Sequence, residues 1–217
     1  MPPPVAVPAV SPDLPAPVGC VVDTVSAPPR SSFAVLVAAY LLLFVAVSVA
    51  EELVARGYLL TNLAEGLQVG PVTGRVALVA AVLLTSGLFG LLHAGNPSAT
   101  LVSTATIALA GVFLATDYVF TGDLAVPLGL HFSWNYAQGV LFDFPVSGIR
   151  VGVAVVRTRE TGPDLVTGGA FGLEAGLLGV VATLLGIAAT ALWVRGRTGR
   201  LAPTPSVRTP DLRWREP

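Results

Sequence analysis

The sequence predicts an all-α protein, a polytopic bundle of about five to six transmembrane helices with disordered ends. Of the 217 residues, 53% are hydrophobic and only 12% are charged. The mean hydropathy of +0.77 is too high for a surface that water must wet on every side. Several apolar stretches approach the length needed to cross the hydrocarbon core of a bilayer. These observations exclude an ordinary soluble globular domain.

The first element, residues 1–32, is expected to be a flexible tail. It is rich in proline and carries little charge and no amphipathic period, so regular backbone hydrogen bonding is disfavoured there. It lacks the basic start and continuous apolar core of a secretory signal. Cys20 is the single cysteine of the chain, which excludes an internal disulfide and a cysteine-based metal cage.

The membrane-embedded bundle is expected over residues 33–194. Its first span continues as a helix through Glu51 and Glu52, and turn-rich joints separate the later ones. The five predicted spans are 33–50, 76–93, 99–120, 124–142 and 171–194. A weaker segment, 58–67, would lie at the membrane interface or re-enter the membrane as a sixth, partial span.

The last segment, residues 195–217, is expected to be a basic, disordered tail. It contains six arginines and two acidic residues. The positive-inside rule then places this end in the cytoplasm, with the N-terminus outside if there are five spans. The arginine-containing linker around residues 150–159 fits that orientation poorly, and a sixth span would invert the part before it. We expect an integral protein of the cell membrane, in contact with lipid.

Charge excludes one class of partner. The net charge is −1 and all 12 basic residues are arginines. Such a chain has no broad cationic surface with which to hold nucleic acid.

Ionisable side chains in the predicted spans point to function, because each costs about 2.5 to 3.5 kcal/mol at the centre of a membrane helix. At the end of the first span, Glu52 and Arg56 are spaced to form an i,i+4 pair. Glu51 is turned about 100° away and is free to face a cavity. On its own, this cluster also fits a group of interfacial charges that ends the span.

Two further clusters contain both histidines of the chain. Phe89 and His93 share a helix face at the end of the second span, and His131 and Asn135 share one inside the fourth. A histidine at a helix C-terminus also fits a favourable dipole interaction, and a His–Asn pair also fits a hydrogen bond between helices.

Taken together, these groups are expected to meet inside the bundle and to activate water. A buried carboxylate is a competent general base, an imidazole relays protons, and a second imidazole with an amide stabilises an oxyanion. These parts suit peptide-bond hydrolysis. A serine or cysteine nucleophile is not indicated, because the chain has no Gly-x-Ser-x-Gly motif and Cys20 lies in the tail.

With these residues in place, the sequence resembles the CAAX protease and bacteriocin-processing family, also called the Abi or type II CAAX prenyl endopeptidase family. Its EExxxR, FxxxH and HxxxN motifs match, in order, Glu51-Glu52 with Arg56, Phe89 with His93, and His131 with Asn135. The strings FGLLHAGNP and GLHFSWNYAQG are also similar, and the likeness covers residues 50–181.

The resemblance implies a helical membrane protease that opens to the cytosolic face and acts on a peptide or protein substrate. In that family Glu51 would activate water, His93 would assist, and His131 with Asn135 would stabilise the oxyanion. The residues also permit a zinc-dependent version, with Glu51, His93 and His131 as ligands, although an HExxH helix is missing. We favour the metal-free reading.

The chain departs from the family pattern in two respects. One span precedes the first motif where members usually carry several, and a homo-oligomer is one way to close such a bundle. The residue before Arg56 is Ala55, where an aromatic side chain is usual.

Two other functional classes remain open. One is a catalytically silent membrane scaffold or bacteriocin immunity protein, which needs the Glu52–Arg56 pair but has little use for Glu51. The other is a proton-coupled transporter, for which we expect internal repeats with broken helices and find none.

Overall fold

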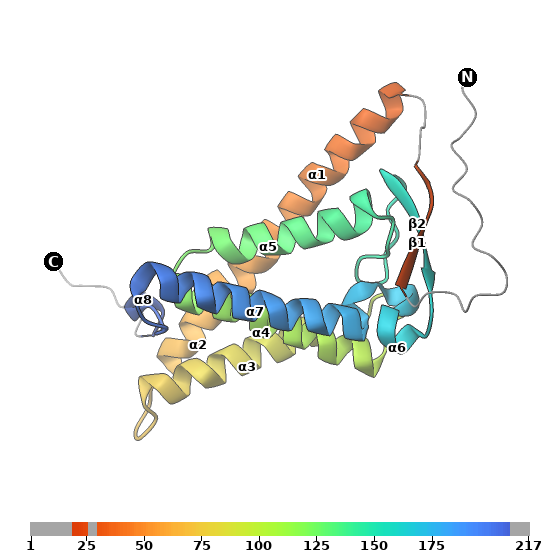
Figure 1. The fold of residues 1–217 in the computed structure, drawn as a ribbon. Helices are drawn as coiled ribbons and strands as arrows, with labels where there is room; N and C mark the ends of the chain where they lie inside the picture. Colours follow the sequence, from red (N-terminus) through yellow and green to blue (C-terminus); the bar gives the residue numbers. More distant parts are fainter. Residues whose placement is uncertain (1–18, 26–29, 209–217) are drawn as a thin grey trace.

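The computed structural model describes residues 19–25 and 30–208, and its core is a bundle of long helices (Figure 1). The first helix continues from α1 (Arg30–Glu52) through a π-helical segment, η1 (Leu53–Leu60), into α2 (Thr61–Gly66). Leu, Val and Ala dominate its first half, and its apolar run covers 35 residues, Ser32–Gly66. Of the two alternatives for 58–67, re-entry into the membrane is wrong, because the helix continues there without reversing; a position at the interface stays a prediction.

Helices α3 (Gly74–Leu92) and α4 (Leu101–Thr121) pack against each other as an antiparallel hairpin. Thr100 begins α4 with a capping box in which its hydroxyl and that of Ser103 each accept from the other's backbone N–H. The two helices pack closely at Gly90, where an added Cβ would lie 2.5 Å from the Thr104 carbonyl oxygen. A larger residue at that position would push the helices apart.

Helix α7 (Leu177–Thr198) packs beside α4, and α5 (Ala125–Tyr136) packs against α1 and α4. Four helical runs in the described part of the chain are long and apolar enough to cross a membrane: Ser32–Gly66, α3, α4 and α7. The predicted span at 124–142 is not among them. It forms a 12-residue α-helix followed by a five-residue π-helix, η2 (Ala137–Leu141), which is shorter than the roughly 20 residues that a span requires.

The last span begins later than predicted. Residues 169–175 form two short 3₁₀ turns, η3 (Gly169–Phe171) and η4 (Leu173–Ala175), separated by Gly172 at φ 120°. The left-handed backbone at Gly172 interrupts the helix. The apolar character of the segment concealed this break.

Part of the predicted N-terminal tail is ordered. Strand β1 (Gly19–Val25) pairs antiparallel with β2 (Val156–Thr161), and the backbone of Cys20 lies opposite Glu160. This ribbon and α6 (Asp164–Thr167) lie at one end of the bundle in Figure 1. The expectation of a flexible tail is therefore wrong for residues 19–25, and residues 1–18 lie outside the described part of the chain.

Part of the predicted C-terminal tail is ordered too. Helix α8 (Pro205–Arg208) lies at the end of the bundle opposite the β ribbon (Figure 1). Val207 is 2% exposed and packs in a cluster with Leu60 and Leu78. The backbone N–H of Thr204 donates to the Val119 carbonyl at 2.8 Å. The expected disorder is therefore wrong for residues 195–208, and residues 209–217 lie outside the described part. The predicted fold class, an all-α polytopic bundle, is confirmed.

Candidate active site

The site is built on a buried ion pair between Glu52 and Arg56, at the junction of α1 and η1. Arg56 Nη1 donates to Glu52 Oε1 at 2.8 Å, and the two side chains are 0% and 1% exposed. Arg56 Nη2 donates to the Gly111 carbonyl of α4 at 3.0 Å, and the guanidinium lies 4.6 Å from the centre of the Phe89 ring. The predicted pairing is confirmed, and it ties η1 to both helices of the α3–α4 hairpin.

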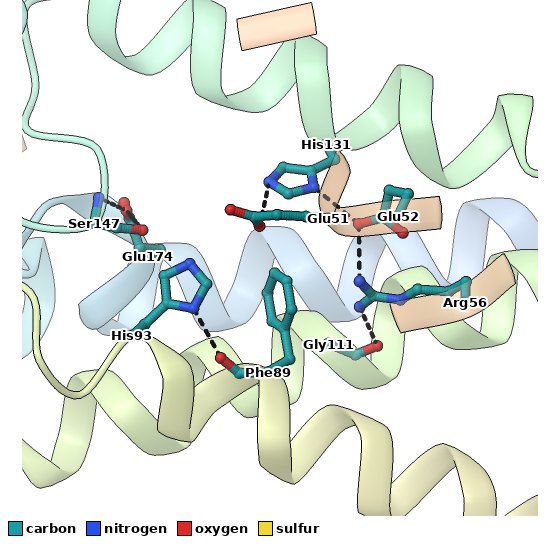
Figure 2. Close-up of polar contacts among 9 residues, drawn as sticks. All are labelled: Glu51, Glu52, Arg56, Phe89, His93, Gly111, His131, Ser147 and Glu174. Carbon is teal, nitrogen blue, oxygen red and sulfur yellow. Dashed lines mark hydrogen bonds and ion pairs between the residues drawn. The ribbon is translucent and has the colours of Figure 1, made fainter. Parts of the chain in front are cut away.

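His131, in the middle of α5, makes the next contact with this pair. Its Nδ1 lies 2.9 Å from Glu52 Oε1. Because an ionised carboxylate can only accept, Nδ1 carries a hydrogen and donates it. Its Nε2 then faces Glu51 Oε2 at 3.8 Å, which is too long for a direct hydrogen bond. The Nδ1 atom of the imidazole is therefore anchored by Glu52, and the Nε2 atom is directed at the Glu51 carboxylate (Figure 2).

Glu51 and Glu52 occupy different environments although they are adjacent in sequence. The Glu51 side chain is 34% exposed and lines a cavity of about 830 Å³, whereas Glu52 is fully buried behind it. Glu51 Oε2 is buried and has no hydrogen-bond partner among the described residues. The expected separation of a structural acid from one that faces a cavity matches this geometry.

His93 caps the C-terminus of α3. Its Nδ1 lies 2.8 Å from the Phe89 carbonyl oxygen, so Nδ1 must donate and Nε2 retains a lone pair when the ring is neutral. The Phe89 ring packs on His93 with centroids 4.8 Å apart and meets His131 edge-on at 6.0 Å. Figure 2 shows Phe89 among His93, His131 and Arg56, where it fixes the spacing of the three side chains.

Four of the six predicted site residues lie around one cavity. Glu51, His93, His131 and Asn135 line it, with Asn135 one helical turn beyond His131 on α5. Glu52 and Arg56 stand behind this wall. Apolar side chains of α1 and α4 are prominent in the remaining lining, and the volume is within the range of ligand-binding pockets.

Glu174 is a cavity-lining carboxylate that the sequence analysis missed. It lies in η4 and is 8% exposed, and its oxygens accept from Gln138 Nε2 and from the backbone N–H of Ser147. Burial raises the pKa of the Glu174 carboxyl above its usual range, although these hydrogen bonds act in the opposite direction. Its sequence signal was a lone acid between a glycine-rich turn and an apolar span.

A zinc ion does not fit the donor groups as they are arranged. In residues 19–25 and 30–208, no three His, Cys, Asp or Glu side chains converge in a way that could hold a metal ion. The Nδ1 atoms of His93 and His131 are held by the Phe89 carbonyl and by Glu52, which leaves the Nε2 atom of each ring without a contact of that kind. The candidate ligand set of Glu51, His93 and His131 would have to rearrange to bind one.

Comparison with known proteins gives one match. Residues 33–137 match the sequence model of the type II CAAX prenyl endopeptidase Rce1-like proteins. Neither a curated protein nor a solved structure matches the chain. The matched segment begins in α1 and ends just after Asn135, so it contains all six predicted site residues. Over residues 33–137 this chain is therefore similar to the type II CAAX prenyl endopeptidase Rce1-like proteins.

Proposed function

We propose that the protein is an intramembrane endopeptidase that hydrolyses a peptide bond with a water molecule activated by Glu51. The observation that carries the proposal is the state of Glu51. Its buried, unpartnered Oε2 faces His131 inside a cavity that His93 and Asn135 also line. A silent scaffold would need Glu52 paired to Arg56 but would gain nothing from a second carboxylate directed at a cavity.

In this mechanism Glu51 removes a proton from water while the water oxygen forms a bond to the scissile carbonyl carbon. The carbonyl oxygen becomes an oxyanion, which the Asn135 amide and a protonated His131 stabilise by hydrogen bonds. When the C–N bond breaks, the proton held by Glu51 passes to the leaving amine. The products are one carboxylic acid, which keeps the second water proton until it ionises, and one amine.

The supporting groups set the orientation of those that react. Glu52 accepts from His131 Nδ1 and so orients the imidazole, whose Nε2 donates to the oxyanion when the ring is protonated. Arg56 holds the Glu52 carboxylate in its buried position by a 2.8 Å ion pair. The Nε2 lone pair of His93 accepts from the attacking water, because the Phe89 carbonyl holds its Nδ1–H.

The cavity walls indicate the kind of substrate. They are mainly apolar, and the helices that form them present lipid-compatible outer surfaces. We therefore propose a peptide or a membrane-anchored protein as the substrate, contact with bilayer lipid, and the cell membrane as the location of the enzyme.

The test is hydrolysis by the purified protein in lipid vesicles containing an apolar reporter peptide, run in water enriched in ¹⁸O. We expect ¹⁸O in the newly formed carboxylate and a loss of rate of about 100-fold or more in His93→Ala. Glu65→Gln is the control. Glu65 lies in the same long helix as Glu51 but does not line the cavity. Equal rates for wild type and His93→Ala, with both proteins folded, would contradict the proposal.

A further inference from the structure

Glu174 belongs to a hydrogen-bond network in the wall of the cavity, outside the segment that matches the family. Ser147 donates to Glu174 Oε1 through its backbone N–H and, at 3.3 Å, through its hydroxyl. Gln138 Nε2 donates to the other carboxylate oxygen and to the Pro145 carbonyl. The loop is therefore held at Pro145 and at Ser147 by one carboxylate and one amide.

Ser147 needs this support. Its φ of 47° is in the left-handed region, which side-chain-bearing residues adopt rarely. The loop also contains the Val146–Ile149 bridge, and the Gly148 N–H donates to the Phe171 carbonyl at 2.7 Å. The network thus fixes an irregular backbone directly on the cavity.

The same loop contacts the segment that carries His93. Asn96 Nδ2 donates to the Ser147 carbonyl at 3.0 Å, and the backbone N–H of Asn96 donates to the His93 carbonyl at 3.1 Å. A displacement of Ser147 would therefore act on the turn that follows His93. Figure 2 shows Glu174 and Ser147 on the side of His93 away from Glu52.

The network also reaches the helix that carries Asn135. Gln138 follows Asn135 by three residues, at the start of η2, and is 3% exposed. Its two contacts fix the end of α5 relative to η4. One buried carboxylate therefore connects the backbone around His93 with the backbone around Asn135, across the cavity that both line.

We propose that Glu174 is a positioning residue, whose carboxylate holds the Ser147 loop and through it sets the placement of His93 and Asn135. The role requires a carboxylate, because both of its oxygens accept. A glutamine at this position would place an N–H₂ group against either Gln138 Nε2 or the Ser147 N–H, and one contact would be lost. The catalytic part of this inference rests on the proposed protease function.

The experiment uses Glu174→Gln in the full chain, with two readouts. The first is ¹⁵N-histidine NMR in detergent micelles, which resolves two imidazoles because the chain has two histidines. We expect the His93 resonance to shift and the His131 resonance to stay, since His131 is anchored by Glu52 instead. The second is peptide cleavage, in which we expect kcat to fall by about tenfold or more, with KM changed less than about threefold.

Glu160→Gln is the matched control. Glu160 also accepts from a threonine hydroxyl and a backbone N–H, those of Thr167 and Gly169, but it does not line the cavity. The Glu160→Gln variant should leave the resonances of both histidines and the value of kcat unchanged.

The outcomes are separable. An unshifted His93 resonance in Glu174→Gln would overturn the proposal whether or not cleavage is observed. A shifted resonance with wild-type kcat would overturn the catalytic part. If Glu174→Gln proves too unstable to study, Gln138→Glu provides the second variant. It places a carboxylate against that of Glu174 and should also shift the His93 resonance. If the wild type cleaves no peptide, the proposed function fails, while the NMR readout still tests the network.

Discussion

Removal of Arg56 is the perturbation whose consequence follows most directly from the geometry. In Arg56→Ala, the fully buried Glu52 loses its 2.8 Å cationic partner, the Gly111 carbonyl loses a donor, and the Phe89 ring loses a cation at 4.6 Å. Removal of one partner of a buried ion pair typically costs about 3 to 5 kcal/mol, because the remaining charge is left uncompensated. We expect a loss of that size in the free energy of unfolding.

The burial of an unpaired charge should outweigh the other losses. A hydrogen bond to a charged group contributes about 1.5 to 3 kcal/mol, and a desolvated cation–π contact about 2 kcal/mol. If the charge dominates, Arg56→Ala combined with Glu52→Gln should be more stable than Arg56→Ala alone, because the neutral amide needs no cation.

Unfolding of the purified protein in detergent micelles, followed by helical circular dichroism, measures these differences. Arg157→Ala is the control, because the Arg157–Asp143 pair is formed at 3.2 Å but Arg157 is 48% exposed. It should cost about 1 kcal/mol or less. An Arg56→Ala variant within about 0.5 kcal/mol of wild type, or a double variant with strictly additive losses, would refute the reasoning.

Three further predictions concern metal, the oxyanion and pH. A chelator should leave the cleavage rate unchanged, since the described acids and histidines do not converge on a metal position; loss of activity that added zinc restores would contradict this. Asn135→Ala should lower kcat by about 100- to 1,000-fold with little change in KM, and an equal rise in KM instead would assign Asn135 to substrate binding. Because burial raises the pKa of Glu174, its contribution to stability is present below the unfolded pKa near 4.5 and is lost as pH rises through the folded pKa. The stability of wild type relative to Glu174→Gln should therefore fall as pH rises above about 4.5, and a difference that does not change with pH would be evidence against that shift.

Local patterns in the sequence predicted most of the bundle and the core of the candidate site. Long apolar runs must bury their backbone hydrogen bonds in helices, so α1, α3 and α4 followed from composition and length. The Glu52–Arg56 contact followed from helix geometry, because residues four apart share a face. The convergence of Glu51, His93 and His131 followed from the cost of isolated ionisable groups in a membrane.

The parts that were missed depend on distant partners. Glu174 is held by Ser147 and Gln138, which lie 27 and 36 residues away, and no helical period connects them. The order of residues 19–25 depends on pairing with β2, more than a hundred residues later. Likewise α8 is ordered because Val207 enters a hydrophobic cluster formed by other helices. The span predicted at 124–142 corresponds to α5 and η2, which end at Leu141 and together are shorter than each of the four long apolar runs.

The most direct test of the central claim is the single-turnover cleavage rate of Glu51→Gln, measured beside the affinity of the same variant for the reporter peptide. Glutamine keeps the size of the side chain but cannot accept a proton from water, so we predict a fall of at least about 1,000-fold in the rate with binding and fold retained. Cleavage by Glu51→Gln at a rate close to that of wild type would show that another group activates the water.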